Sequence, residues 1–482
     1  MKIPTMQVTQ RQRRKRLHAV LALLAFLPGC STINSVFTPG PQPGQPGYVS
    51  GFLGGVAADE PRAVLAGQEV LSEGGTAGDA AVAVGLTLAV TLPSRAGLGG
   101  GGACLAYAPS EKSKARGIPE AILFVPPAPT SGSAGGDRPA AVPMLMRGLY
   151  LLHARYGSRP FESLISSAEQ LARFGVPVSR ALAKDLSIVA GPLFADPAAR
   201  ATFGINGVPL TEGQTLRQPD LGATLAQIRV SGVGDMYQGA LAQRIVQSSP
   251  LVGGSISAAD LRAGLPKLTA PLIRDYGNDK VAFLPPPADG GLAAEAAFNV
   301  LAKNPDDVAS AAARSLAVAS RWRAGGVTAE ALLASANLPP PTDTLYPAST
   351  SFVTLDRYGD AVACSLTMNN LFGTGRILPN LGFVAAASPA AVTPPLLSAG
   401  LVWNNHINAF RAAVAASGQS AAPVAVAVGL INALRTKQPM SVPVPDPGRA
   451  NAIACSEYLP GVNGSCGWAT DPRGGGLALG AN

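Results

Sequence analysis

Residues 349–375 read STSFVTLDRYGDAVACSLTMNNLFGTG, and most of our expectations about the architecture start here. Residues 351–355 and 361–368 are short apolar runs, which are typical of buried strands. The polar residues 356–360 between them include the glycine and the aspartates of a turn. The stretch therefore predicts two strands joined as a β-hairpin.

The composition indicates a large folded core. The chain has 482 residues, of which 47% are hydrophobic and 14% charged, so we expect one large domain or two closely packed layers. The net charge of +8 falls to +2 when the six basic residues before residue 30 are left out, because no acidic residue accompanies them. A nucleic-acid partner is therefore not expected.

The N-terminus has the pattern of an export signal. A basic region precedes the apolar run 19–27, which is too short to remain in a bilayer as a spanning helix. Leu27, Gly29 and Cys30 fit the bacterial lipobox, in which the cysteine is lipidated and the peptide before it is removed; the alternative is an ordinary secretory signal with an incidental cysteine. We expect a lipoprotein signal peptide at 1–29, a Pro/Gly-rich tether at 30–48, and a lipid anchor that holds the chain to the bacterial cell envelope, facing the periplasm.

The rest of the chain shows no internal repeat, which indicates a globular fold. Helical patterns lie at 61–71, 79–90, 142–156, 161–174, 179–186, 220–232, 236–247 and 292–301, and a strand is expected at 103–107. Residues 97–102 satisfy the letters of the dinucleotide fingerprint GxGxxG. A helix precedes them and a strand follows, which reverses the order that this motif needs, so nucleotide binding is not expected.

Histidine chemistry has few candidates in this chain, because it contains three histidines. His18 lies in the signal, and His153 lies in a helical run where a packing or surface role is expected. His406 lies in a polar connection without the flanking residues of a general base.

The four cysteines after Cys30 match no zinc or iron–sulfur spacing, so we expect neither a metal nor a cofactor. Cys455 and Cys466 could close a small loop in an oxidising compartment. Cys104 and Cys364 lie in apolar runs and are expected to be small core residues.

A hydrolase that is poor in histidine can still activate a hydroxyl group if the residue that carries it becomes the first residue of a chain. Its own α-amine, with an unperturbed pKa of about 8, then accepts the proton. Such a site requires an internal cut directly before a serine or a threonine.

Several separated segments resemble the gamma-glutamyltranspeptidase family over most of the mature chain. Residues 70–83, VLSEGGTAGDAAVA, are similar to its ILxxGGNAVDAAVA segment, and residues 93–102, PSRAGLGGGG, to its EPxxSGIGGGG segment. Further similarities follow in family order at 142–149, 153–157, 174–179 and 285–291. The resemblance implies the α+β fold of the N-terminal-nucleophile hydrolases, a four-layer αββα sandwich in which two stacked, mainly antiparallel sheets are flanked by helices.

The self-processing segment of this family, TTHxSVVDxxGNAVxxTxTxNxxFGTG, is similar without a gap to residues 349–375. The resemblance implies that the chain cuts itself between Ala348 and Ser349, and that Ser349 supplies both the nucleophilic hydroxyl and the basic amine; Thr350 is the second candidate. It divides the mature chain into a large-subunit-like region at 49–348 and a small-subunit-like region at 349–439. Residues 440–482 are then expected to form a Gly/Pro-rich tail.

The same resemblance implies roles for four further residues. Thr367 would hydrogen-bond and orient the nucleophile, and Asn369 would face the substrate. Ser398 preserves one hydroxyl of a serine pair that contacts the substrate. Gly418 stands where a glycine pair donates backbone N–H groups to the oxyanion, although its neighbour here is Gln419.

Two departures from the family pattern concern the substrate. An arginine in an FREMAP-like segment clamps the α-carboxylate of γ-glutamyl groups, and this chain has Val125 there. The acidic LNNxMDDF segment corresponds to VAAASP at 384–389. An unpaired charge in an apolar pocket is costly, so we expect a small amide or peptide substrate that is less polar than a γ-glutamyl compound.

Two functions remain open from the sequence. The first is a self-processing amide hydrolase or acyltransferase. The second is a non-catalytic envelope lipoprotein that keeps the fold as a binding module, which the missing clamp and the serine in place of threonine both favour.

Overall fold

The computed structural model describes residues 51–109, 117–130, 137–341, 348–440 and 444–481. They belong to one compact unit, Val49–Asn482. The predicted signal peptide, tether and lipidation site Cys30 lie outside the described residues. Within the described ranges, no helix is long and apolar enough to cross a bilayer.

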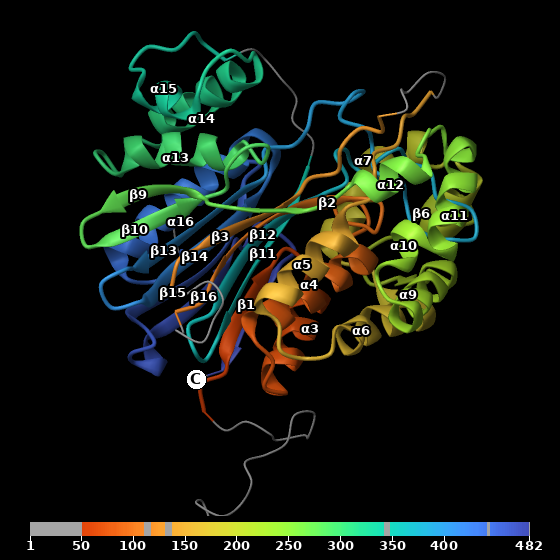
Figure 1. Cartoon of the computed structure of the whole chain (residues 1–482), viewed down its shortest axis with the longest axis horizontal. Coiled ribbons are helices and arrows are strands. Elements are labelled where there is room, and N and C mark those ends of the chain that lie inside the picture. The colour runs from red at the N-terminus through yellow and green to blue at the C-terminus, as the bar shows by residue number, and fades with distance from the viewer. Residues whose placement is uncertain (1–50, 110–116, 131–136, 342–347, 441–443, 482) are drawn as a thin grey trace, which may run out of the picture. The chain divides into compact units, whose positions relative to one another are not determined.

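Two antiparallel sheets form the centre of the unit (Figure 1). The first runs in the order β17 (Leu477–Ala481), β1 (Gly54–Ala58), β11 (Thr350–Asp356), β12 (Ala361–Thr367), β2 (Gly101–Tyr107), β3 (Glu120–Phe124) and β8 (Lys267–Thr269). The second runs in the order β16 (Cys466–Thr470), β15 (Arg449–Leu459), β14 (Ala409–Ser417), β13 (Ser398–Asn404), β10 (Asp279–Phe283) and β9 (Leu272–Tyr276).

Helices cover the outer face of each sheet (Figure 1). The first sheet carries α3 (Pro61–Ser72), α4 (Ala77–Thr91) and α5 (Leu145–Tyr156). The second carries α13 (Gly290–Leu301) and α16 (Ala422–Thr436). This arrangement confirms the four-layer α+β sandwich that the resemblance implied.

The predicted hairpin is confirmed as β11 and β12, which pair with Thr350 opposite Leu366 and Leu355 opposite Ala361. Every residue of both strands is buried. Alternate side chains of β11 serve two cores, because Phe352 packs toward the helices whereas Val353 and Leu355 pack between the sheets. Burial on both faces explains why the stretch reads as a nearly continuous apolar run.

Further helices and short strands surround this core. The helices are α6 (Phe161–Phe174), α7 (Arg180–Leu193), α8 (Pro197–Phe203), α9 (Pro219–Ser231), α10 (Asp235–Gln238), α11 (Ala240–Ser248), α12 (Ala258–Ala263), α14 (Val308–Arg323) and α15 (Ala329–Ala334). Two-residue strands pair β4 (Val176–Pro177) with β7 (Thr215–Leu216), and β5 (Gly204–Ile205) with β6 (Val208–Pro209).

Three expected elements differ from the structure. The single helix expected at 236–247 is two helices, α10 and α11, which meet at Gly239. The helix expected at 179–186 extends to Leu193 as α7. The segment expected to be a tail at 440–482 contributes β15, β16 and β17 to the two sheets, because its apolar residues pair with strands that are distant in sequence.

The expectation that Cys104 and Cys364 are unpaired core residues is wrong, because the two form a disulfide. They are opposite each other on the neighbouring strands β2 and β12, an adjacency that is created by folding across a separation of 260 residues. Cys455 and Cys466 also form a disulfide, between β15 and β16, as their spacing allowed.

Candidate active site

Ser349 lies directly before β11, at the end of a strand in the interior of the first sheet. Its residue exposure is 1%. The preceding residue, Ala348, lines a cavity of about 250 Å³. The Ala348 side of the bond between Ala348 and Ser349 therefore borders this cavity, whereas Ser349 itself is not among the residues that line it.

A buried polar network fixes the start of β11. Asp59 accepts hydrogen bonds from the Thr350 hydroxyl at 3.1 Å and from the Ser351 N–H at 3.0 Å. Asn451 of β15 donates to Asp59 at 2.8 Å and to the Ser351 hydroxyl at 2.9 Å. The Thr350 hydroxyl is thus committed to a buried carboxylate, which makes Ser349 the better placed of the two candidate nucleophiles.

Thr367 ends β12 beside Ser349. Its hydroxyl lies 3.5 Å from the carbonyl oxygen of Ala348 and accepts a 2.8 Å hydrogen bond from the Asn369 N–H. The glycine run before β2 allows this close arrangement, because a Cβ on Gly100 would lie 2.3 Å from the Thr367 carbonyl oxygen. The run thus serves close backbone packing. In the structure α4 precedes it and β2 follows it, which is the reverse of the strand-then-helix order that a dinucleotide fingerprint needs.

Gly418 lies at the end of β14 and lines the same cavity as Ala348. Its φ of +111° favours glycine, and a Cβ there would lie 2.3 Å from the Pro447 carbonyl oxygen. The next residue, Gln419, also has a positive φ, of +56°, and also lines the cavity. The structure therefore brings the backbone predicted to bind the oxyanion to the cavity beside the predicted scissile bond.

Asn369 is fully buried, and both hydrogens of its amide are directed at main-chain oxygens. Its Nδ2 donates to Ala387 at 2.9 Å and to Pro126 at 3.3 Å. Its Oδ1 is buried without a hydrogen-bond partner among the described residues. The side chain thus keeps an acceptor, while its donors hold together the two segments that depart from the family pattern.

Ser398 lies at the start of β13 and is fully buried. Its hydroxyl donates to the Leu396 carbonyl oxygen at 2.9 Å, and it packs against Gly290 at the start of α13. Ser398 is not among the residues that line the cavity beside Ala348.

Charged residues that the sequence analysis did not single out line this cavity. Arg95 makes a bidentate pair with Asp185 of α7, with both N–O distances at 2.7 Å, and the Ser94 hydroxyl donates to the same carboxylate. Burial alone would lower the pKa of the Arg95 guanidinium, but the adjacent Asp185 carboxylate raises it above its ordinary value. Arg95 lies within the family-like segment 93–102, which was the one available signal for it.

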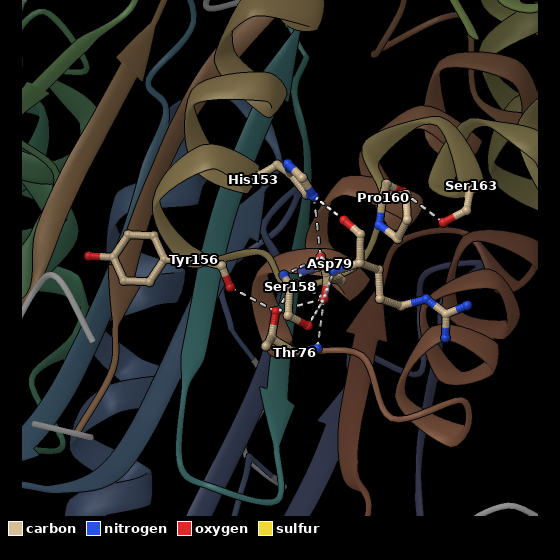
Figure 2. A network of polar contacts seen from close by, with 8 residues as sticks. Thr76, Asp79, His153, Tyr156, Ser158, Pro160 and Ser163 are labelled. Carbon is tan, nitrogen blue, oxygen red and sulfur yellow. Dashed lines mark hydrogen bonds and ion pairs between the residues drawn. The ribbon is translucent and has the colours of Figure 1, made fainter. Parts of the chain in front are cut away.

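His153 belongs to a separate polar network (Figure 2). Its Nε2 lies 2.6 Å from the Arg159 carbonyl oxygen and 3.6 Å from Asp79. Asp79 forms a capping box with Thr76 at the start of α4 and accepts from Ser158. This cluster of serine, histidine and aspartate is structural, because it fastens the helix start to the 156–160 loop.

The network lies far from Ser349. The Ala77 N–H donates to Asp356 at the opposite end of β11, and seven strand residues span about 20 Å. His406 lies in the turn before β14, whereas Gly418 follows the end of that nine-residue strand. Neither histidine reaches the cavity, and the described residues contain no cluster of three or more side chains that could hold a metal ion.

Comparisons with known proteins find relatives in sequence and in fold. Residues 63–337 match the family model described as Gamma-glutamyltranspeptidase, a match that ends before Ser349. The chain is 30% identical over 381 residues to the "Glutathione hydrolase proenzyme" of Escherichia coli (strain K12), covering 69% of this chain and 65% of that protein. It is 27% identical over 347 residues to the "Capsule biosynthesis protein CapD proenzyme" of Bacillus anthracis, covering 67% of this chain and 62% of that protein. The chain thus spans just under two-thirds of either relative.

Solved structures show the same fold. A cephalosporin acylase from Bacillus halodurans superposes with a TM-score of 0.73 at 21% identity, covering 92% of this chain and 99% of that one. The gamma-glutamyltranspeptidase of Helicobacter pylori superposes with a TM-score of 0.52 at 26% identity, covering 61% and 95%.

Proposed function

The chain belongs to the gamma-glutamyltranspeptidase family, and from that premise we propose that it is a self-processing amide hydrolase or acyltransferase whose nucleophile is Ser349. One observation carries the proposal. The Ala348–Ser349 bond lies at the start of an interior strand and beside a cavity, with the Thr367 hydroxyl 3.5 Å from the Ala348 carbonyl oxygen.

Self-processing would proceed as an acyl shift. The Ser349 Oγ adds to the Ala348 carbonyl carbon, its proton passes to the Ser349 nitrogen, and the C–N bond breaks to leave an ester. The carbonyl oxygen gains negative charge in this step, and the nearby Thr367 hydroxyl is the group that can donate to it. Breaking the C–N bond frees the α-amine of Ser349. Water then hydrolyses the ester, which frees the Ser349 hydroxyl and leaves a carboxylate on Ala348.

The processed site would then act on an external amide. The free amine, with an ordinary pKa of about 8, takes the proton of the Ser349 hydroxyl during attack. The backbone at Gly418 and Gln419 lines the same cavity and supports a role in holding the oxyanion. The acyl group leaves to water or to an acceptor amine.

A substrate other than a γ-glutamyl compound is part of this proposal. Val125 supplies no charge for an α-carboxylate, and Ala386 and Ala387 supply none for an α-ammonium. The amide donors of Asn369 are directed at Pro126 and Ala387. A zwitterionic head group would therefore meet no opposite charge at these positions.

A gel tests self-processing. Cleavage would divide the mature chain into residues 30–348, which is 319 residues, and residues 349–482, which is 134 residues. The sample must be reduced first, because the Cys104–Cys364 disulfide would join the two fragments. Ser349→Ala should abolish the cut. Ser163→Ala should leave it unchanged, because Ser163 is exposed and its hydroxyl donates a hydrogen bond to the Pro160 carbonyl oxygen.

The proposal predicts two reduced fragments from protein made in its own host, with serine at the new terminus. A single full-length band in the reduced sample of protein made in its own host would exclude the self-processing enzyme. The non-catalytic binding module would then remain as the function.

We also propose that the chain is a lipoprotein anchored in the bacterial cell envelope and facing the periplasm. Support comes from the basic and apolar N-terminus, from Cys30 after a small residue, and from the two disulfides, which are typical of oxidising compartments.

A further inference from the structure

One helix, α7, lines two neighbouring cavities with one continuous face. Its first part, through Ile188, faces the cavity beside Ala348. Its last part, from Val189 to Leu193, faces a second cavity of about 330 Å³. Leu371 also lines both cavities, so they are neighbours on either side of this side chain.

The second cavity is apolar along its helix side and floor. Val189, Pro192 and Leu193 come from α7, and Leu371 and Phe372 from the loop after Asn369. Two charged residues also line it: Asp137, which is paired with Arg376 at 2.6 Å, and Arg138, which donates to the Thr374 carbonyl oxygen at 3.0 Å. A cavity of this size and lining accepts a flexible or aromatic hydrocarbon group.

The first cavity contains cationic side chains that are available to an anion. Its two acids have partners, since Asp185 binds Arg95 and Asp59 binds the start of β11. Lys184 has no ion-pair partner among the described residues. Arg180, one turn earlier on α7, makes one 3.4 Å contact with Glu212, and both of these side chains are mostly exposed.

Two other cations of this wall are occupied. Arg449 is paired with Asp446 at 2.8 Å, and Arg473 is paired with Asp471 at 2.6 Å. The cations that can bind an anionic ligand are therefore Lys184 and Arg180 of α7, which line the same cavity as Ala348.

We propose that the substrate is an N-acyl amino acid or a similar amide that joins an apolar acyl group to an anionic amine. The acyl chain occupies the apolar cavity, the carboxylate binds Lys184 and Arg180, and the amide lies between them near Ser349. This inference rests on the proposed function. Hydrolysis then consumes one water, breaks the C–N bond, and releases a free carboxylic acid and an amino acid.

Binding tests the inference independently of turnover, because both cavities are present in the uncut chain. Calorimetry with the full mature protein compares N-octanoylglycine, neutral N-octanoylglycinamide and N-acetylglycine. N-octanoylglycine should bind most tightly. N-octanoylglycinamide should bind about tenfold more weakly than N-octanoylglycine. N-acetylglycine should bind more weakly by about 100-fold or more.

Two variants assign the two ends of the ligand. Lys184→Met should weaken N-octanoylglycine about tenfold and leave N-octanoylglycinamide unchanged. Val392→Asp, at a half-buried loop position of the apolar cavity, should weaken both octanoyl ligands. Lys303→Met, at an exposed lysine after α13, is the matched control and should change neither.

The outcomes separate the two proposals. Suppose that the chain is cut before Ser349 but the three ligands bind with equal affinity, or that neither Lys184→Met nor Val392→Asp changes the affinities as stated. The proposed substrate class is then wrong, and Ser349 remains the proposed nucleophile. If the predicted order of affinities is found with a chain that remains uncut, the two cavities bind the ligand as proposed, but the proposal that Ser349 is a catalytic nucleophile is wrong.

Discussion

The hydroxyl oxygen of Thr367 lies 3.5 Å from the carbonyl oxygen of Ala348, across the end of the β11–β12 hairpin. The last residue of β12 thus contacts the peptide bond that precedes Ser349, just before the start of β11. Because that carbonyl would become an oxyanion during self-processing, we expect Thr367 to act on the proposed cut more directly than on the Ser349 side chain.

Thr367→Val should slow self-processing about 100-fold, because it keeps the side-chain shape and removes the donor to the developing oxyanion. Thr367→Ser keeps the hydroxyl and should stay within about tenfold of the natural chain. The rate is read from reduced gels after a pulse of synthesis. Equal rates for the valine and serine variants would show that the hydroxyl has no part in the cut.

Gly418→Ala should both destabilise the chain and impair the site. The new Cβ would lie 2.3 Å from the Pro447 carbonyl oxygen, at a φ of +111°. Gly207→Ala is the matched control, because its φ is +79° and no atom lies within 4 Å of a Cβ there. We expect the control to cost about 1 kcal/mol of unfolding free energy and Gly418→Ala to cost more, by denaturant titration. Similar losses would argue against a tight contact at Gly418.

Asp360→Asn should remove a pH dependence of stability. Burial, followed by the neighbouring Asp356 carboxyl, raises the pKa of Asp360 to about 8. Its folded pKa therefore exceeds its unfolded value of 3.8, so its contribution is fully present below about pH 4 and is lost as the pH rises through about 8.

We expect Asp360→Asn to be more stable than the natural chain at pH 9 by about 1 kcal/mol or more, and the gap should narrow toward pH 5. Asp306→Asn, at an exposed aspartate, serves as the control. Denaturant titrations at the two pH values measure the effect, and parallel behaviour of all three proteins would contradict it.

The Cys104–Cys364 disulfide should join the two fragments after cleavage, because Cys104 precedes the proposed cut and Cys364 follows it. Without reducing agent, the processed chain should run as one band in denaturing gels and the double variant C104A/C364A as two. C455A/C466A is the matched control, because both of its cysteines lie after Ser349. It should keep the single band; fragments separating equally in all three proteins would contradict the bridge.

Cys30→Ala should move the protein out of the membrane fraction, because acyl chains on that thiol are the proposed anchor. Labelling with radioactive palmitate should mark the natural chain and not the variant. Retention of label by Cys30→Ala would point to another modified residue.

The sequence determined by itself those features that depend on neighbouring residues. The apolar runs at 351–355 and 361–368 were enough to predict the strands of the β11–β12 hairpin, and the sequence of the turn at 356–360 was enough to predict where it reverses. The buried helix α4 followed from its small apolar residues and from Asp79 in its first turn. The order of motifs along the chain indicated the family and hence the sandwich.

Only the tertiary structure decided which distant residues meet, because strand pairing and helix packing join segments without any local signal. It paired Cys104 with Cys364 and placed β15 in the second sheet. It directed the Asn369 amide at Pro126 and Ala387. It also laid one face of α7 over both cavities, which no periodicity within residues 180–193 could have revealed.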